Sequence, residues 1–354
     1  MAEFIRQAGK VAWRCPSNIA IVKYWGKHGE QLPNNTSLSI TLQNAYTETV
    51  VRYEIDKNLN NVVPTFSFGK QQNLFFENRI NRFLTRLQPQ IPFLAHLRMN
   101  IESKNNFPHS TGIASSASAF GSLALCLCAI ENQIFGHISG YLDFNQKASY
   151  LARIGSGSAC RSVYEGFVVW GQHKEIETSS DIYAVPVNKN IHPVFQKMQD
   201  SILIVSSEKK LISSSEGHSL MESNPYAKVR YQFANANIGE LMTTLKKGDM
   251  DHFIKITENE ALGLHALMML SEANYMLLKP NTLAIIERVK RYRTEQKIPV
   301  CFTLDAGPNI HLLYPEEYKD EVHNFIREEL LPFCEHNQWI HDRIGTGPVQ
   351  LVNE

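Results

Sequence analysis

The spacing of apolar residues divides the chain into strand-like and helix-like stretches. Residues 36–53 alternate apolar and polar side chains and are rich in Thr, Val and Tyr, which is typical of a strand with one buried face. A long apolar run follows Ser115 and ends near Phe135, and its length indicates a helix. For the first part of the chain we predict strands over 36–53, 97–103, 163–171, 181–187 and 202–206, and helices over 115–135 and 143–154.

The pattern changes after about Asn224, where apolar residues recur three and four positions apart and predict consecutive helices. Strands and helices alternate irregularly along the whole chain, so we predict an α+β fold. We place a domain boundary near 185–200 and divide the chain into residues 1–190 and 191–354. The elements predicted for the second part are helices over 225–246, 249–270, 282–296 and 316–335, and strands over 300–305, 310–314 and 348–352.

Composition excludes several classes of function. The 354 residues include 35 basic and 35 acidic side chains, without a long block of one charge, so nothing favours nucleic acid or a membrane surface as partner. The chain starts without the long apolar segment of a secretory signal, and no apolar run approaches the roughly 18 residues of a membrane span. We therefore expect a cytoplasmic protein that binds neither nucleic acid nor membranes.

The six cysteines do not form a Cys-x-x-Cys pair, and the histidines lack the spacing of paired ligands on a helix. We predict no protein-built metal site. Cys126 and Cys128 lie within the apolar run and are expected in the core as reduced thiols.

The most informative segment, residues 108–120, contains Pro, Gly and many Ser and Ala residues and leads into the predicted helix at 115–135. Small side chains at a helix start leave backbone N–H groups open to an anion such as phosphate, and Ser115 and Ser116 add hydroxyl donors. A closely packed helix start explains the same composition equally well. The segment alone leaves both interpretations open.

Three further segments combine polar side chains with turns. Residues 16–27 form an apolar strand with Lys23 and Tyr24 near its end, which suits either an anion site or an edge strand with a solvated lysine. Residues 155–162, Gly-Ser-Gly-Ser-Ala-Cys-Arg-Ser, precede a buried strand and favour a binding loop over a flexible turn. Asp305 ends a strand before a tight turn and is either a general base or a turn-stabilising aspartate.

Together these segments closely resemble the diphosphomevalonate decarboxylases, a family within the GHMP kinase superfamily. The resemblance covers most of the chain in the family's order. It rests on NIAIVKYWGK (18–27), NNTSLSITL (34–42), NNFPHSTGIASSASAF (105–120), GSGSACRSVYEGFVVW (155–170), VSSEKKLISSSEG (205–217) and LDAGPN (304–309).

The chain departs from the family at the phosphate segment and at the substrate rim. His109, Ser110 and Thr111 stand where small residues are common, and His218 follows Gly217 where a methionine is usual. An arginine that bacterial members often carry near Ser215 is missing. These departures concern substrate detail more than the chemistry.

The resemblance implies roles for individual residues. Asp305 would activate the substrate's 3-hydroxyl, Lys23 would pair with Asp305, and Ser116 and Arg161 would complete the catalytic set. The substrate would contact Asn18, Tyr24, Arg79, Ser156, Ser158 and Arg161, and ATP would contact Pro108, Gly112, Ala114, Ser115, Ser116 and Ser118.

The resemblance also implies a ribosomal protein S5 domain 2-like N-terminal domain and a ferredoxin-like C-terminal domain, usually in a homodimer. Implied ligands are ATP, Mg²⁺ and mevalonate 5-diphosphate. Three alternatives remain open: a small-molecule kinase of the same superfamily, a decarboxylase specific for the monophosphate, and a sensor without catalytic activity.

Overall fold

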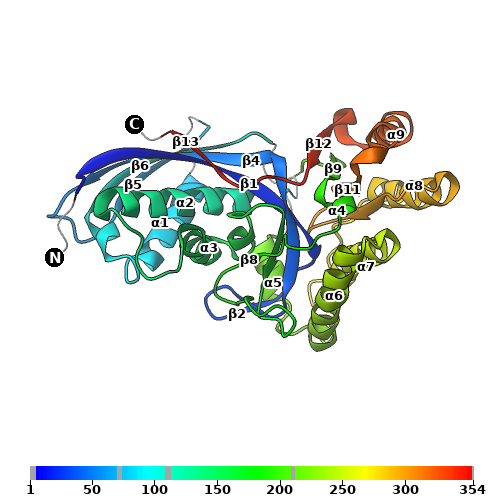
Figure 1. Cartoon of the computed structure of the whole chain (residues 1–354), viewed down its shortest axis with the longest axis horizontal. Helices are drawn as coiled ribbons and strands as arrows, with labels where there is room; N and C mark the ends of the chain where they lie inside the picture. The colour runs from blue at the N-terminus through cyan, green and yellow to red at the C-terminus, as the bar shows by residue number, and fades with distance from the viewer. Residues whose placement is uncertain (1–4, 70–73, 108–112, 209–211, 353–354) are drawn as a thin grey trace.

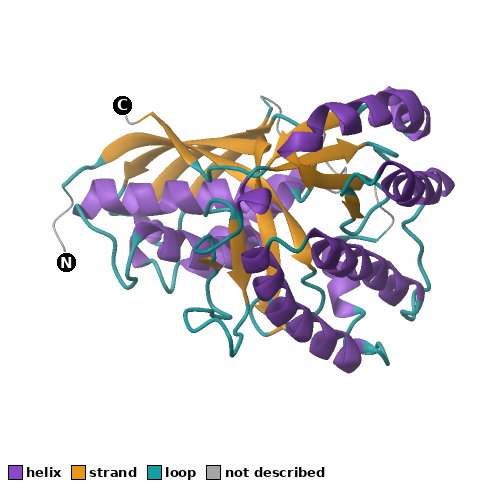
Figure 2. Ribbon diagram, turned by 45° about the vertical axis from the view of Figure 1, so that its right-hand side comes forward, coloured by secondary structure: helices purple, strands orange, loops and turns teal. Residues whose placement is uncertain are grey.

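The computed structural model describes residues 5–69, 74–107, 113–208 and 212–352. They form one large and one smaller sheet, with helices packed on both (Figures 1 and 2). The strands are β1 (Ala8–Val22), β2 (Lys27–His28), β3 (Leu32–Pro33), β4 (Ser37–Ile55), β5 (Val63–Phe68), β6 (Leu97–Asn105), β7 (Phe167–Trp170), β8 (Val185–Pro186), β9 (Met198–Leu203), β10 (Cys301–Thr303), β11 (Ile310–Pro315), β12 (Trp339–Arg343) and β13 (Val349–Val352). The helices are α1 (Leu74–Leu87), α2 (Ser115–Phe135), α3 (Phe144–Gly155), α4 (Pro193–Gln196), α5 (Ser214–Ser219), α6 (Ala227–Lys247), α7 (Met250–Met269), α8 (Pro280–Gln296) and α9 (Lys319–Phe325).

The large sheet has the order β13-β1-β4-β6-β5, and β7 and β8 extend it from β4. Side chains along β6 alternate strictly between buried and exposed, because one face of the sheet is covered and the other is not. Figure 1 shows α1, α2 and α3 together on one face of the long strands. Their apolar side chains share one core with β1, β4 and β6, as the sequence pattern predicts.

Helix α2 is buried on nearly all sides, which explains its apolar composition. Small side chains let it approach the sheet closely: a Cβ atom added to Gly121 would lie 2.6 Å from Cys15 Sγ. The expectation that no segment is long and apolar enough to span a membrane was wrong for this helix, since it meets both criteria. However, 78% of its most apolar window is buried inside the protein, as in a core helix.

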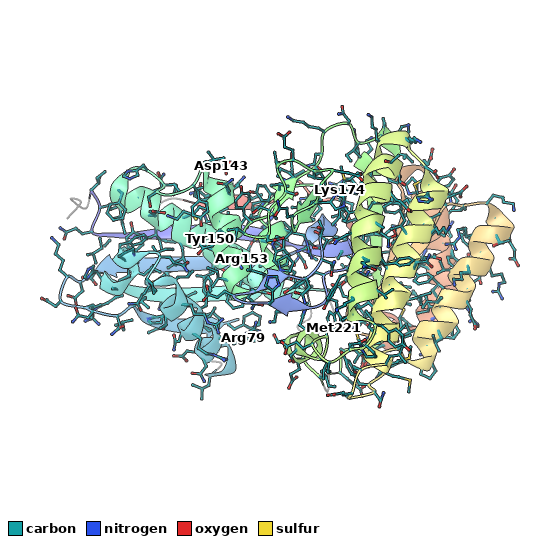
Figure 3. All side chains as sticks on the ribbon, turned by 90° about the horizontal axis from the view of Figure 1, so that it is seen from below. Arg79, Asp143, Tyr150, Arg153, Lys174 and Met221 are labelled. Carbon is teal, nitrogen blue, oxygen red and sulfur yellow. The ribbon has the colours of Figure 1, made fainter. Side chains whose placement is uncertain are left out.

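The smaller sheet has the antiparallel order β10-β11-β9-β12. The long helices α6, α7 and α8 lie side by side as one layer (Figures 1 and 3). Apolar residues of α7 and α8 form a core with the sheet, in which Ile285, Phe302 and Leu312 are fully buried. This arrangement and the large sheet give the predicted α+β fold.

Several elements differ from the predictions. The helix expected over 316–335 is broken after α9 by a π-helical turn at Ile326–Leu330 and a 3₁₀ turn at Leu331–Phe333, where Pro332 cannot donate a backbone hydrogen bond. The strand predicted over 181–187 is reduced to β8, and β7 is shorter than predicted. Strands β5 and β12 were not predicted.

The two halves of the chain share packing and pairing. One apolar core contains Ile21 of β1, Phe195 of α4, Leu241 of α6 and Phe253 of α7, so it crosses the expected boundary. In addition, β13 pairs with β1, the first strand of the large sheet. The division into residues 1–190 and 191–354 stays a prediction.

Candidate active site

An ion pair between a buried lysine and a partly exposed aspartate joins the two halves of the chain. Lys23 follows β1, and its Nζ donates hydrogen bonds to the backbone oxygen of Ala20 at 2.6 Å and to Asp305 Oδ1 at 3.0 Å. The Lys23 side chain is 1% exposed, whereas that of Asp305 is 28% exposed. Asp305 was expected to be either a general base or a turn-stabilising aspartate. A carboxylate that contacts a cation and still reaches solvent favours the general base.

Burial lowers the pKa of Lys23, while the negative charges of Asp305 and Glu260 raise it in the opposite direction. A lysine in this setting exchanges its proton more readily than a solvated one, which suits a group beside reacting atoms.

Arg161 is buried next to this pair, close enough to feel the charge of Asp305 but without a direct ion pair among the described residues. It lies in a 3₁₀ turn at Gly157–Arg161, is 2% exposed, and donates to the Ser37 hydroxyl and weakly to Asn18 Oδ1 at 3.4 Å. Asn18 is itself fixed by a 2.7 Å bond to the Ser162 hydroxyl. Among the described residues no carboxylate forms an ion pair with Arg161. A buried guanidinium whose printed hydrogen bonds all go to neutral groups favours an anionic ligand.

The start of α2 lies beside the loop that bears Arg161. Its N-cap residue, Ala114, has a left-handed backbone at φ 45°, and no side-chain capping bond occurs there among the described residues. The first backbone N–H groups therefore carry the partial positive charge of the helix terminus. The Ser116 hydroxyl lies 3.1 Å from that of Ser156, which connects this helix start to the loop that bears Arg161.

Three predicted ATP contacts need comment. Ser118 is fully buried, and its hydroxyl bonds to Thr47 at 2.6 Å and to the Ser115 carbonyl, so it stabilises the packing of α2 on β4 and does not face a ligand. Pro108 and Gly112 lie outside the described residues, as do His109, Ser110 and Thr111.

An apolar pocket opens beside the start of α2. Of the described lining residues, only Arg79 of α1 is charged. It lies 5.3 Å from the Phe120 ring, and Figure 3 labels it on α1. Arg79 therefore lines the same pocket as Ser115 and Ser116. The pocket is lined by Thr49, Phe66, Phe68, Phe76, Arg79, Ile80, Ile101, Ser103, Asn105, Ser115, Ser116, Ala119, Phe120 and Leu123.

The rings of Tyr24 and His218 contact each other at an angle of 39°, with centroids 4.3 Å apart. The Tyr24 hydroxyl is buried and has no hydrogen-bond partner among the described residues. It lies against Gly157, where an added Cβ would come within 2.8 Å of it. An orphaned hydroxyl beside a loop with Ser156 and Ser158 suits a ligand that accepts hydrogen bonds.

His218 of α5 is held in one neutral form. Its Nδ1 accepts the Gly26 N–H at 2.9 Å, and its ring lies 4.5 Å from the Trp25 ring. Burial, together with the nearby charge of Lys27, lowers the pKa of His218 to about 3. Ser215 is exposed on the same short helix.

Sequence reasoning missed three buried side chains that bind the main chain around Lys23 and Asp305. Glu260 and His265 of α7 and Arg230 of α6 bind the main chain of Lys23 or of Asp305. Local spacing carries no signal for them, because these partners lie far apart in the chain.

The site offers few metal ligands of its own. No cluster of three or more His, Cys, Asp or Glu side chains with ligand geometry occurs within the described ranges. A cation here would depend mainly on ligand oxygens and water.

Comparisons with known proteins agree with this arrangement. Two family models match, the diphosphomevalonate decarboxylase-like N-terminal domain over residues 15–184 and the mevalonate 5-diphosphate decarboxylase C-terminal domain over residues 201–350. A diphosphomevalonate decarboxylase from Ganoderma lucidum is 30% identical over 326 residues, which cover 87% of this chain and 78% of the relative.

Solved structures are similar over almost the whole chain. Mevalonate diphosphate decarboxylase from Staphylococcus aureus has 28% identity and a TM-score of 0.82, with 98% of each chain covered. A complex of MDDEF with MVAPP, AMPPCP and magnesium has 27% identity and a TM-score of 0.79, covering 97% of this chain and 99% of that one. The fold is thus that of the GHMP kinase class. Within that class, the chain belongs to the diphosphomevalonate decarboxylase family.

Proposed function

We propose that this protein catalyses the ATP-dependent decarboxylation of mevalonate 5-diphosphate to isopentenyl diphosphate, ADP, phosphate and CO₂. The observation that carries the proposal is the buried Arg161 guanidinium beside the Lys23–Asp305 pair. Glu260 is already paired with Arg230, so Lys23 and Arg161 are left to share the single carboxylate of Asp305, and the substrate carboxylate would supply a further anion.

The reaction needs a better leaving group than hydroxide. Asp305 would accept the proton of the tertiary 3-hydroxyl as that oxygen attacks the γ-phosphorus of ATP and ADP leaves. Lys23 would stabilise the charge on the phosphoryl group during transfer. The original C3–O bond, whose oxygen now carries the phosphoryl group, would then break with its electron pair going to phosphate. The electrons of the carboxylate C–C bond would form the new double bond as CO₂ departs.

Substrate contacts follow from the same geometry. Arg161, oriented by Asn18, would bind the substrate carboxylate. Tyr24, Ser156 and Ser158 would bind the terminal diphosphate, which satisfies the orphaned Tyr24 hydroxyl.

The residues present also fit ATP. The uncapped start of α2, with Ala114, Ser115 and Ser116, provides N–H and hydroxyl donors for phosphates. The adjoining apolar pocket suits a nucleotide base. Arg79, expected as a substrate contact, lines this pocket. Mg²⁺ would neutralise phosphate charge during transfer, held mainly by phosphate oxygens and water. The related MDDEF complex contains AMPPCP and magnesium.

Compartment and assembly are part of the proposal. Six free, buried cysteines support a reducing, cytoplasmic location. A homodimer is proposed from the family resemblance.

Coupled product formation tests the function. With MgATP and mevalonate 5-diphosphate, ADP and CO₂ should appear in a one-to-one ratio, measured in the same reaction. ADP without CO₂ would instead indicate a kinase, and equal kcat/KM for the monophosphate would indicate relaxed specificity. Binding without either product would indicate a sensor.

A further inference from the structure

Helix α7 contacts the main chain of both partners of the Lys23–Asp305 pair. The Glu260 carboxylate accepts the Lys23 backbone N–H at 2.8 Å. One helical turn and a half further on, His265 Nε2 donates to the Asp305 backbone carbonyl at 3.1 Å. A single rigid element therefore holds Lys23, which follows the first strand of the chain, and Asp305, which follows β10.

The hold on Lys23 extends to its carbonyl group. Arg230 of α6 forms a bidentate pair with Glu260, at 3.0 and 2.6 Å, and its NH2 also donates to the Lys23 carbonyl at 3.2 Å. Asn35 donates to the same carbonyl at 2.9 Å. Glu260 accepts a further bond from Asn237 at 2.6 Å. Every strong partner of this carboxylate is thus buried and fixed.

We propose that α7 is the positioning element of the reacting pair, and that Glu260 and His265 are positioning residues for Lys23 and Asp305. The proposal rests on the proposed function only in taking Lys23 and Asp305 as the reacting groups. Main-chain anchoring on both sides sets the separation of the two side chains, and small errors in such a separation reduce turnover strongly.

Electrostatics support the same role for Glu260. The charged groups that face Lys23 are Asp305, Glu260, Arg161 and, through the Lys23 carbonyl, Arg230. Glu260 raises the pKa of Lys23 against the effect of burial and of Arg161. Without its negative charge, Lys23 loses its proton at lower pH, so the alkaline limb of kcat moves to lower pH.

The decisive variant is Glu260→Gln, with Glu258→Gln as matched control. Glutamine keeps the size and one oxygen acceptor for the Lys23 N–H but removes the charge. Glu258 lies on the same helix and also forms a bidentate pair, with Arg293 at 2.6 and 3.1 Å, without contacting Lys23 or Asp305. Both variants lose the charge of an arginine-paired glutamate on α7, and Glu260→Gln should lose more in Tm because Glu260 also accepts from Lys23 and Asn237.

Glu260→Gln should lower kcat by about 10- to 100-fold, leave KM for mevalonate diphosphate nearly unchanged and shift the alkaline limb of kcat to lower pH. Glu258→Gln should change neither kcat nor its pH profile. If Glu260→Gln loses only stability, as Glu258→Gln does, Glu260 is merely structural and the proposal fails.

His265 gives a second, independent pair of variants. His265→Leu removes the donor to Asp305 and should lower kcat by about tenfold or more, whereas His265→Gln retains an N–H donor and should stay within about threefold of the wild type. Equal kcat for the two variants would overturn the role of His265.

A readout without turnover separates this proposal from the proposed function. In protein labelled with ¹³Cε-lysine, the resonance that disappears in Lys23→Met reports the protonation of Lys23. Its titration midpoint should fall in Glu260→Gln and stay unchanged in Glu258→Gln, even if the wild type forms no CO₂. An unchanged midpoint in Glu260→Gln would refute the electrostatic part.

Discussion

Among single residues, Asp305 has two proposed roles: it accepts the proton of the substrate hydroxyl and it pairs with Lys23. Replacing it with Asn keeps the shape but removes the proton acceptor and the anion beside Lys23. We expect Asp305→Asn to lower kcat by about two to four orders of magnitude. Because its partner Lys23 is buried, stability should also fall, by about 1–3 kcal/mol, which is less than for a fully buried pair since Asp305 is partly solvated. Steady-state kinetics and thermal unfolding measure both effects.

Lys23→Met serves as the companion variant. The double variant should lose much less activity than the product of the two single losses, because each residue acts through the other. Retained kcat in Asp305→Asn would show that Asp305 is only a turn residue.

The buried His218 should make the stability of the folded protein depend on pH in the acid range. Its folded-state pKa, about 3, lies below the unfolded value near 6.5, so the unfolded chain binds the extra proton and stability is lost as pH falls from about 6.5 towards 3. His218→Met loses the bond from Gly26 and should be less stable by about 1 kcal/mol at pH 8. The deficit should shrink or reverse at pH 5.

Thermal melts at both pH values test this, with the exposed His137→Met as control. A deficit that is the same at pH 8 and pH 5 would show that His218 does not couple to protons.

At the level of elements, β12 and β4 are joined by one buried carboxylate. Asp342 accepts the N–H groups of Gln43 and Asn44 at 2.8 Å and of Ala45 at 2.6 Å, and it lies opposite Asp200 on β9. Burial, with a contribution from Asp200, raises the pKa of Asp342 to about 6. The folded state therefore binds this proton more tightly than the unfolded chain, and stability is lost as pH rises from about 4 to about 6.

Asp342→Asn cannot titrate in this window. Relative to wild type, the variant should gain in Tm as pH rises from 4 to 7, measured beside the exposed Asp320→Asn as control. The same pH-independent difference for both variants would argue against a titrating Asp342.

The elements also show which signals the sequence carried. The first and last residues of α6, α7 and α8 were predicted within a few positions, because each helix buries one long apolar face. The predicted helix at 316–335 failed because the apolar period continues past α9 into a segment that Pro332 forces out of regular geometry. Strand β12 was missed since its side chains are mostly half-buried and do not alternate.

For the whole molecule, the α+β class followed from the irregular order of elements, but the site did not follow from spacing. Lys23 and Asp305 are 282 positions apart, and only the family resemblance placed them together. Neither the sequence spacing nor the family resemblance predicted the contacts of Glu260 and His265, because these contacts depend on how α7 packs against both halves of the chain. For Ser118 the motif suggested an ATP contact, but the packing of α2 on β4 is enough to explain its hydroxyl.

The pairing of β13 with β1 sets an order for biosynthesis. A ribosome makes β1 early and β13 after every other strand, with Trp13 opposite Gln350 in the finished sheet. Until residues 349–352 emerge, one edge of β1 presents unpaired N–H and C=O groups to other nascent chains. Translation that stops short of β13 therefore yields a product with an open edge, which chaperones or self-association would have to cover.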